Sequence, residues 1–475
     1  MKPLRASPSP AAIPDLRYSA FLSQKFKQNA PAGFNPEDSD IPDDFMPHQS
    51  ALLKWAIRRG KAAIFADTGL GKSRMQVAWA DAVCRKTNGS VLILAPLAVA
   101  QQTVQEGDAI GVQVTHCRDA ADVKPGINIT NYERLHKFDA RAFVGVVLDE
   151  SSCIKHHDTK SFALLTEAFR KTSYKLCATA TPAPNDWTEL GTHAEFLGIC
   201  SRAEMLAEFF THDGGDTSVW RLKGHAQHIF WKWVSGWGAL IRKPSDLGFD
   251  DSAYALSPLE MIEHIIEVDL PFGDSLFASE AQTLSERRDA RRASLDYRVK
   301  ACADVVNADK QPWVVWCDLN AEGDALTRSI PGAVQISGSD DAEVKEQRLM
   351  DFASGKIRVL VSKPSICGFG LNWQHAARMA FVGVTDSFEA YYQAVRRCWR
   401  FGQKRPVNVH IFASQLEGAV VSNLRRKERE AIAMAESLSK ETHEAVISQV
   451  LGNDRQTNDY NASKSVSLPS FLKVA

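Results

Sequence analysis

The sequence predicts an α/β protein with two successive parallel-sheet units and a helical insertion in the first unit. Short apolar runs alternate with helical patterns over 61–186, and a second alternation begins near residue 313. Such alternation is typical of parallel sheets covered by helices. Over 187–243 the alternation stops, and the sequence there is aromatic and helix-like. A chain of 475 residues is also too long for one core, which favours more than one unit.

Composition and charge are those of an ordinary globular protein. Lys and Arg (56) balance Asp and Glu (57), so a nucleic-acid binder of this composition would need positive charge gathered in a cleft. The nine cysteines include no C-x-x-C pair, which argues against a disulfide framework or a structural zinc site. No apolar run approaches the roughly 20 residues that cross a bilayer, and the N-terminus lacks the apolar core of a secretory signal. We therefore expect a cytoplasmic protein.

Residues 1–33 are rich in Pro, Ser and Ala and are predicted to form a flexible or surface-bound lead-in. Pro47, His48 and Gln49 then precede an amphipathic helix over 51–59. The Gln49 amide offers both a donor and an acceptor, so it could read adenine if a phosphate loop follows the helix. Taken alone, Gln49 is simply a residue at the start of a helix.

The segment 61–73, KAAIFADTGLGKS, organises the first unit. An apolar strand over 62–65 ends in a loop with two glycines, and Lys72, Ser73 and a helix follow. This order is the phosphate-loop arrangement, in which backbone N–H groups and a helix N-terminus surround nucleotide phosphates. Lys72 would reach the β- and γ-phosphates, and Ser73 would hold Mg²⁺. The strict pattern has Gly where Ala66 stands, and the alternative is a glycine-rich turn with a lone lysine.

Four further strands of the first unit end in polar residues. They are predicted over 91–96, 126–130, 145–148 and 176–178. In an open parallel sheet, ligands bind at the carboxyl ends of the strands. Asp149 and Glu150 follow the third strand, where Asp149 would act on Mg²⁺ through water and Glu150 would orient or deprotonate the attacking water. Adjacent acids at a strand end are otherwise commonly a helix N-cap, which is the alternative.

Tryptophans stand among basic residues in the segment 187–243. They are Trp220, Trp231, Trp233 and Trp237. This mixture could stack on nucleic acid, but the core of a small helical subdomain is its more common origin, and we favour that interpretation. We interpret 244–273 as a connector and 275–307 as a charged, helical segment.

The second unit has its own polar strand ends. Its strands are predicted over 313–317, 333–337, 357–362 and 379–384. Gln393, Arg397 and Arg400 are three or four residues apart on a predicted helix, so they share one face. Arginines in such a row can reach a γ-phosphate across a cleft and stabilise developing charge. The alternative is a solvated, charged helix face.

Nine motifs follow one another along 34–437. They are PHQ (47–49), DTGLGKS (67–73), LAPLAV (94–99), ITNYERL (129–135), DESS (149–152), ATATPAPND (178–186), ISGSDD (336–341), GFGLNW (368–373) and QAVRRCWRFGQ (393–403). In this order they resemble the motifs of Swi/Snf-type ATPases of helicase superfamily 2. The resemblance is strongest to the compact forms carried by bacteriophages and prophages, which implies action in a bacterial or phage-infected host cell.

The resemblance implies two RecA-like lobes, each a parallel sheet flanked by helices, with ATP and Mg²⁺ between them. It also implies a C-terminal bracing helix, here over 420–438. The expected parts are the lead-in (1–33), the first lobe (34–186), the helical insertion (187–250), a connector with a helical segment (251–307), the second lobe (308–415), and the bracing helix with the tail (416–475).

By the same resemblance, residues of both lobes bind and hydrolyse ATP. Nucleotide binding is expected from Gln49, Thr68, Gly69, Leu70, Gly71, Lys72, Ser73, Gly370 and Gln393. The expected catalytic residues are Lys72, Asp149, Glu150, Arg397 and Arg400, with Ser73 and Asp149 at the Mg²⁺ ion. Thr179 and Thr181 would couple the state of the nucleotide to movement of the lobes.

DNA is the implied partner, and it would lie along the opposite face of the cleft. Contacts mainly to its backbone imply salt-sensitive and sequence-tolerant binding. The candidate contact residues are Pro96, Asn131, Arg134, Ser337, Gly338, Ser362 and Asn372.

Three residues depart from the family pattern. Ala180 replaces a usual glycine, which is a mild change. Arg396 replaces a usual acid and Trp399 a usual histidine, so contacts around the last motif must differ from those in the family.

The expected function is a motor that moves along duplex DNA. The alternatives are a strand-separating helicase acting on single-stranded DNA or RNA, and a non-catalytic clamp or adaptor. Replication, remodelling of protein-bound DNA, recombination and support of a methylation system are all compatible tasks.

Overall fold

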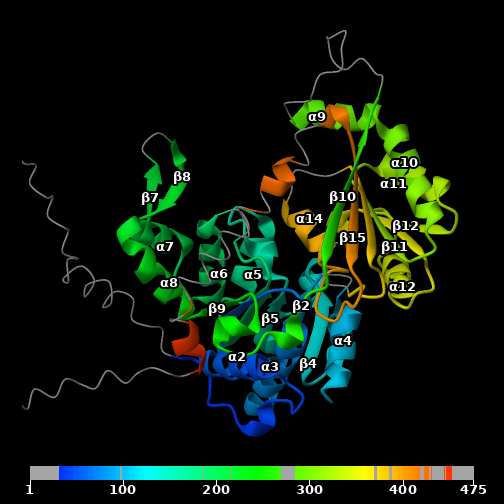
Figure 1. Cartoon of the computed structure of the whole chain (residues 1–475). Coiled ribbons are helices and arrows are strands. Elements are labelled where there is room, and N and C mark those ends of the chain that lie inside the picture. Colours follow the sequence, from blue (N-terminus) through cyan, green and yellow to red (C-terminus); the bar gives the residue numbers. More distant parts are fainter. Residues whose placement is uncertain are drawn as a thin grey trace, which may run out of the picture.

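The computed structural model contains two α/β bodies, which we call the first lobe and the second lobe (Figure 1). It describes residues 31–96, 99–183, 186–213, 216–268, 284–367, 372–383, 388–417, 422–426, 429, 443 and 446–451. Each lobe is built on one parallel sheet, and the predicted fold class is therefore confirmed.

The first lobe contains a sheet of seven strands, and every neighbouring pair is parallel. In spatial order they are β3 (Val114–His116), β4 (Ile127–Asn131), β2 (Ser90–Ala95), β5 (Phe143–Asp149), β6 (Tyr174–Thr179), β1 (Lys61–Ala66) and β9 (Gly238–Ile241). The phosphate-loop strand β1 and the acid-bearing strand β5 both pair with β6. Their carboxyl ends consequently lie at the same edge of the sheet.

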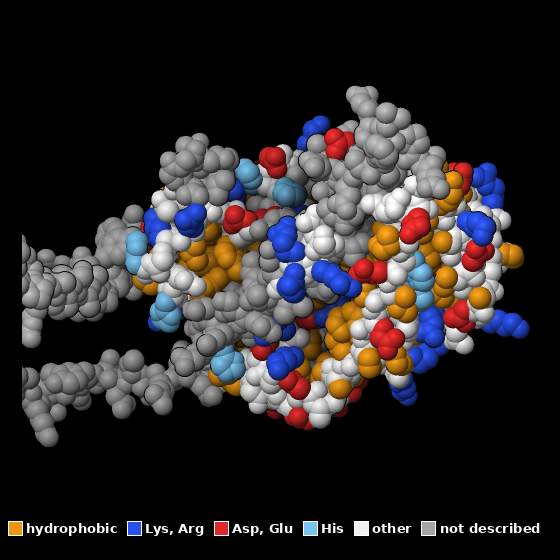
Figure 2. Space-filling view, turned by 45° about the horizontal axis from the view of Figure 1, so that its top comes forward, with side chains coloured by type: hydrophobic (Ala, Val, Ile, Leu, Met, Phe, Trp, Pro, Cys, Tyr) orange, Lys and Arg blue, Asp and Glu red, His pale blue; other side chains and the backbone are white. Residues whose placement is uncertain are grey.

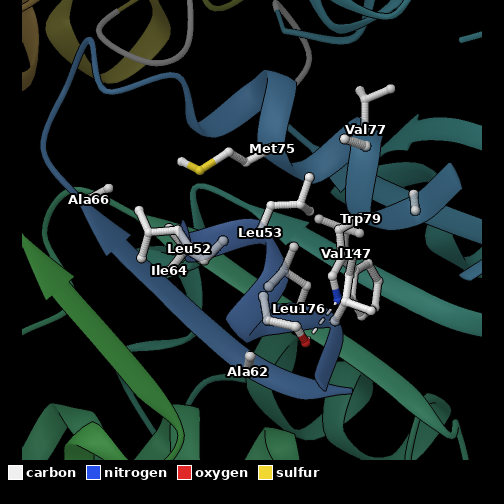
Figure 3. Close-up of a cluster of buried hydrophobic side chains, with 14 of the residues drawn as sticks. Leu52, Leu53, Ala62, Ile64, Ala66, Met75, Val77, Trp79, Val147 and Leu176 are labelled. Atoms are coloured by element: carbon white, nitrogen blue, oxygen red, sulfur yellow. Dashed lines mark hydrogen bonds between the residues drawn. The ribbon is translucent and has the colours of Figure 1, made fainter. Parts of the chain in front are cut away.

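Helices cover both faces of this sheet. The helices α2 (Pro47–Arg59), α3 (Lys72–Thr87) and α4 (Ala100–Ala109) lie on one face, and α5 (Lys160–Ala168), α6 (Leu190–Leu197), α7 (Arg202–Phe209) and α8 (Gln227–Ser235) on the other. Side chains alternate along β1, so Ala62, Ile64 and Ala66 join one core while Ala63 and Phe65 join the opposite core. Figure 3 shows the first of these sets packed against side chains from α2 and α3.

The second lobe contains a six-stranded parallel sheet. Its spatial order is β10 (Leu259–Ile266), β15 (Val407–Ser414), β14 (Arg378–Val382), β11 (Trp313–Cys317), β13 (Val359–Ser362) and β12 (Ala333–Ile336). The helices are α9 (Leu284–Ala293), α10 (Leu295–Ala308), α11 (Asn320–Ser329), α12 (Ala342–Ala353), α13 (Pro364–Cys367) and α14 (Phe388–Val395). Strand β11 is buried on both faces, with Val314 and Trp316 in one core and Val315 in the other.

The insertion is only partly helical, which differs from the prediction for 187–250. Between α7 and α8 lies an antiparallel hairpin of β7 (Phe210–Asp213) and β8 (Asp216–Leu222). Strand β9 then returns to the first sheet and pairs with β1. Trp231 and Trp237 are almost fully buried in the core beneath the insertion, so the favoured interpretation of these tryptophans as packing residues is confirmed.

The interpretation of 244–273 as a connector is also incomplete. It contains β10, the edge strand of the second sheet, which pairs with β15 along its whole length. A chain segment that leaves the first lobe at β9 thus enters the second lobe at β10. The short 3₁₀ helix η9 (Ser252–Tyr254) lies between the two strands.

The predicted lead-in and bracing helix lie largely outside the described residues. Of the lead-in, the backbone N–H groups of Ala32 and Gly33 donate to carbonyl groups of Arg59 and Arg58 at the end of α2. Near the C-terminus, the described residues of the predicted brace, 422–426 and 429, are helical. Further on, Val446 and Val450 are buried in the first-lobe core. In the described part of the chain, no helix is long and apolar enough to span a membrane.

Candidate nucleotide-binding site

The phosphate loop connects β1 to α3 and depends on two glycines. Gly69 and Gly71 have φ values of +93° and +85°, which favour glycine because other residues pay a steric cost there. A Cβ on Gly71 would lie 2.2 Å from Nε2 of Gln49. Ala66 is the last residue of strand β1 and is buried, so the departure from glycine at this position requires no special backbone freedom.

Gln49 ties α2 to the phosphate loop. Its Oε1 accepts from the backbone N–H of Met46 at 3.1 Å, and its Nε2 donates to the carbonyl of Leu70 at 3.2 Å. An amide group has two N–H donors and two acceptor lone pairs. One N–H and one lone pair of Gln49 therefore remain for recognition of a base.

Lys72 lies over the phosphate loop and donates from Nζ to the carbonyl oxygens of Ala66 at 2.7 Å and Asp67 at 3.2 Å. Burial lowers the pKa of Lys72, while the nearby carboxylates of Glu150, Asp67 and Asp149 oppose that shift. The ammonium group thus sits in a place where negative groups stabilise its charge, and a phosphate would do the same.

Asp149 is the last residue of β5 and is largely buried. Gln76 on α3 donates from Nε2 to Asp149 Oδ1 at 2.8 Å. Burial raises the pKa of Asp149 to about 6, and the Gln76 hydrogen bond acts in the opposite direction. A nearby cation would favour the charged form, as expected of a carboxylate that serves a metal ion.

Glu150 follows directly and adopts left-handed backbone geometry, with φ 55° and ψ 53°. A residue other than glycine in this region stores about 1–3 kcal/mol, and such strain clusters at functional sites. Glu150 does precede the short helix η5 (Ser151–Ile154), but its side chain makes no capping hydrogen bond. The N-cap alternative for this acid pair is therefore not what the structure shows.

The Glu150 carboxylate instead joins residues from both lobes. Its Oε1 accepts from Thr179 Oγ1 at 2.9 Å, Ser152 Oγ at 3.3 Å and Gln393 Nε2 at 3.4 Å. The same Gln393 amide donates to Thr181 Oγ1 at 3.2 Å, and the backbone N–H of Thr181 donates to Thr179 Oγ1 at 3.1 Å. The two predicted coupling threonines thus lie in one hydrogen-bond network with Glu150 and Gln393.

Arg397 of the second lobe is buried and Arg400 is partly buried, so the helix face that they share is not a solvated one. Arg397 donates from Nε to the carbonyl of Gln393 at 3.0 Å and from Nη2 to Gln393 Oε1 at 3.2 Å. Burial, reinforced by Arg397, lowers the pKa of Arg400 to about 10. Arg400 Nε is buried and has no hydrogen-bond partner within the described residues. A buried donor without an acceptor is costly, so this group suits an anionic ligand.

A cavity of about 310 Å³ brings these groups together between the lobes. Its lining includes the predicted residues Gln49, Thr68, Gly69, Gly71, Lys72, Ser73, Asp149, Glu150, Gln393, Arg397 and Arg400. This volume lies within the range of small-molecule sites, roughly 300–1,000 Å³. Leu70 contributes through its carbonyl to Gln49, and Gly370 lies outside the described residues.

Three of the lining residues that sequence reasoning missed come from two elements not assigned to the site. Gln102 and Glu106 come from α4, and Tyr254 comes from η9 in the presumed connector. The Tyr254 ring stacks on Phe401 of the second lobe with 4.6 Å between ring centroids, and it meets His48 edge-on at 5.1 Å. Nothing local in the sequence marked Tyr254, because its neighbours in space come from both lobes.

Six of the seven predicted nucleic-acid residues fall into two groups, one where β2 and β4 end in the first lobe and one where β12 and β13 end in the second lobe. Ser362 is buried, and its hydroxyl donates to the carbonyl of Ile336 at 2.8 Å. Asn131 is also buried and accepts from the backbone N–H of Arg134 at 3.0 Å. Asn372 lines the cavity between the lobes rather than an outer face.

The other candidates lie at strand ends with accessible surface. Pro96, Arg134 and Ser337 are partly exposed, and Gly338 is exposed. These four residues follow β2, β4 and β12, at the carboxyl ends of the strands. Contact with DNA stays a prediction for all seven residues.

Comparison with known proteins gives two family matches. Residues 48–232 match the SNF2-related domain, and residues 305–402 match the helicase conserved C-terminal domain. The chain is 22% identical over 452 residues to "Putative protein p41" of Acyrthosiphon pisum secondary endosymbiont phage 1, which covers 81% of this chain and 96% of that protein. Among solved structures, it is similar to the SWI2/SNF2 ATPase core of Sulfolobus solfataricus in complex with dsDNA. That similarity has 19% identity and a TM-score of 0.40, and it covers 88% of this chain and 99% of the other.

Proposed function

We propose that this chain, which belongs to the Swi/Snf-type ATPases of helicase superfamily 2, is a motor that hydrolyses ATP between its lobes and moves along double-stranded DNA. Its SNF2-related and helicase C-terminal domains make it a DNA-dependent ATPase. The observation that carries the proposal is the shared cavity, in which the acids Asp149 and Glu150 of the first lobe meet Arg397 and Arg400 of the second.

The cavity fits a nucleoside triphosphate. The N-terminus of α3 and Lys72 would hold the phosphates, and the glycine at position 71 leaves space that any Cβ would fill. The unpartnered Nε of Arg400 would gain a phosphate oxygen as its acceptor. The free N–H and lone pair of Gln49 would read adenine.

Mg²⁺ would be held by Ser73 and Asp149, which both line the cavity. When bound, it would neutralise charge on the phosphates. Mg²⁺ usually keeps several waters and binds one or two carboxylates together with substrate phosphates. Within the described residues there is no group of three or more His, Cys, Asp or Glu side chains that could hold a metal ion by themselves.

Residues of both lobes would have separate roles in hydrolysis. Glu150 would orient and deprotonate the attacking water, and its fixed backbone and three hydrogen bonds hold the carboxylate in place. Arg397 and Arg400 would stabilise the charge that develops on the transferred phosphoryl group. Because Gln393 binds both Glu150 and Thr181, a change in lobe separation would alter the surroundings of the catalytic carboxylate.

DNA would be bound through its phosphate backbone, which needs positive charge gathered locally because the whole chain is nearly neutral. Figure 2 shows Lys and Arg side chains gathered near the middle of the face in view, between its two halves. Movement without strand separation predicts displacement of a third strand from a triplex in an ATP-dependent manner. Glu150→Gln is the negative control for this assay.

Strand separation is the second candidate function. It is favoured by one observation, the β7–β8 hairpin, which projects from the first lobe (Figure 1). A forked duplex with one labelled strand distinguishes the two functions. Triplex displacement without unwinding of the fork supports the translocase, whereas efficient unwinding of the fork supports the helicase.

A further inference from the structure

A second set of contacts joins the lobes outside the nucleotide cavity. The Arg396 guanidinium of the second lobe pairs through Nη2 with Oδ2 of Asp67, the residue that precedes Thr68 of the phosphate loop. Tyr392 donates its hydroxyl to Asp67 Oδ1 at 3.1 Å, and Arg396 Nε donates to the Tyr392 hydroxyl oxygen at 3.0 Å. We call Asp67, Tyr392 and Arg396 the cross-lobe triad.

The triad is shielded from water. Side-chain exposure is 5% for Arg396 and 20% for Asp67. The guanidinium carbon of Arg396 lies 4.8 Å from the ring centroid of Trp399 and 5.2 Å from that of Tyr392. Trp399 is itself fixed, because its Nε1 donates to the carbonyl of Ser257 at 2.7 Å. An ion pair in such surroundings is much less screened than one on the surface.

On the first-lobe side, Asp67 is bound to the phosphate loop through its backbone and its carboxylate. Its Oδ1 accepts from the backbone N–H of Thr68 at 2.6 Å, and its carbonyl accepts from Lys72 Nζ at 3.2 Å. Its own backbone N–H donates to the carbonyl of Ile241 in β9 at 2.9 Å. A force on the Asp67 carboxylate therefore acts directly on the loop that would hold the phosphates.

On the second-lobe side, Arg396 lies between residues that face the cavity. Gln393 is three residues before it and contacts Glu150. Arg397 follows it directly, and Arg400 comes four residues later, both in the cavity lining. The position of Arg396 thus sets the position of the whole group relative to the first lobe.

We propose that Asp67 and Arg396 are positioning residues for ATP hydrolysis: their buried ion pair holds Gln393, Arg397 and Arg400 opposite the phosphate loop when the lobes are closed. This inference rests on the proposed function. It also gives a shared reason for two departures from the family pattern, because Arg396 and Trp399 replace the usual acid and histidine and contact each other here.

The test measures steady-state ATP hydrolysis with duplex DNA for Asp67→Asn, Arg396→Gln and the double variant. Each single variant is expected to lose at least about tenfold in kcat, as expected when one partner of a buried charge pair across an interface is removed. KM for ATP is expected to change little, because Lys72, Ser73 and Gln49 are unaltered. The double variant should lose no more than the worse single variant, since the two changes remove one shared interaction.

Two further variants separate positioning from a general loss of structure. Asp67→Glu keeps the charge and should retain most of the activity that Asp67→Asn loses. Lys300→Gln removes an exposed ion pair with Asp304 in α10 and should leave kcat unchanged. Thermal unfolding shows whether each variant folds. If an Arg396 variant does not fold, comparison of kcat between Asp67→Glu and Asp67→Asn still tests the positioning role.

The outcomes distinguish this inference from the proposed function. A wild-type protein without DNA-stimulated ATPase activity would overturn the proposed function itself. An active wild type with single variants that retain full kcat would overturn only the role of the triad. If the fold-losses in kcat of the two single variants multiply in the double variant, Asp67 and Arg396 act independently, and their role as a pair would be overturned.

Discussion

Replacement of Gly71 by alanine should weaken both the phosphate loop and nucleotide binding. Gly71 has φ +85°, and an alanine in left-handed geometry costs about 1–2 kcal/mol. The new Cβ would stand 2.2 Å from Gln49 Nε2, so that side chain must move and lose its hydrogen bond to Leu70, worth about 1 kcal/mol. The expected total is about 2–3 kcal/mol, a large share of a typical stability of about 5–15 kcal/mol.

Gly111→Ala is the matched control. Gly111 has φ +72°, but a Cβ there meets nothing within 4 Å, so it carries the backbone cost alone. Urea unfolding should therefore show a free-energy loss for Gly71→Ala about 1 kcal/mol larger than for the control. Only Gly71→Ala should also raise KM for ATP, because it displaces Gln49. A loss of about 1 kcal/mol in binding corresponds to an increase of about fivefold in KM. Equal unfolding energies and equal KM values for the two variants would refute the role assigned to the contact with Gln49.

Four further variants test separate parts of the account. Lys72→Ala and Glu150→Gln should abolish turnover while thermal unfolding stays near wild type, and full ATPase activity in either would contradict the site assignment. Arg298→Met should cost about 3–5 kcal/mol, because it removes the ion-pair partner of the buried Glu322 at 2.8 Å and leaves the buried Glu417 to pair with Arg291 at 3.6 Å; urea unfolding measures this, with the exposed Lys300→Met as the control, and equal losses would disprove it. Arg134→Ala should reduce the slope of log affinity for duplex DNA against log salt by about 1 if Arg134 contacts a phosphate; an unchanged slope would remove Arg134 from the interface.

The sequence was sufficient to predict those parts of the fold and the site that depend on residues close together in the chain. The phosphate loop could be recognised because strand, glycines, Lys72 and helix are consecutive, and the comparisons confirm the family that its motifs predicted. Asp149 and Glu150 could be placed near Lys72 because strands of one parallel sheet end at one edge. The α/β class followed from the same alternation of strand and helix.

The missed elements depend on contacts between distant parts of the chain. Strands β3 and β9 have three and four residues, too few for a periodic pattern to stand out. Strand β10 belongs to the second sheet only because it pairs with β15, about 150 residues later in the sequence. These pairings are tertiary, and no local signal specifies them.

The same limit applied to individual side chains. Tyr254 enters the site because Phe401 and His48 meet it from opposite lobes. Arg396 could be recognised as a departure from the family, but its partner Asp67 stands 329 residues earlier. Sequence order gave no means to join these two charges.

The most direct test of the central claim is steady-state ATP hydrolysis by the purified chain with duplex DNA, single-stranded DNA and RNA at matched low salt. Low salt is required because contacts to the phosphate backbone weaken steeply as salt rises. The account predicts strong stimulation by duplex DNA and much weaker stimulation by the single strands. Preferential stimulation by a single strand would contradict the translocase and favour the helicase, and no stimulation by any of the three polymers would contradict the motor.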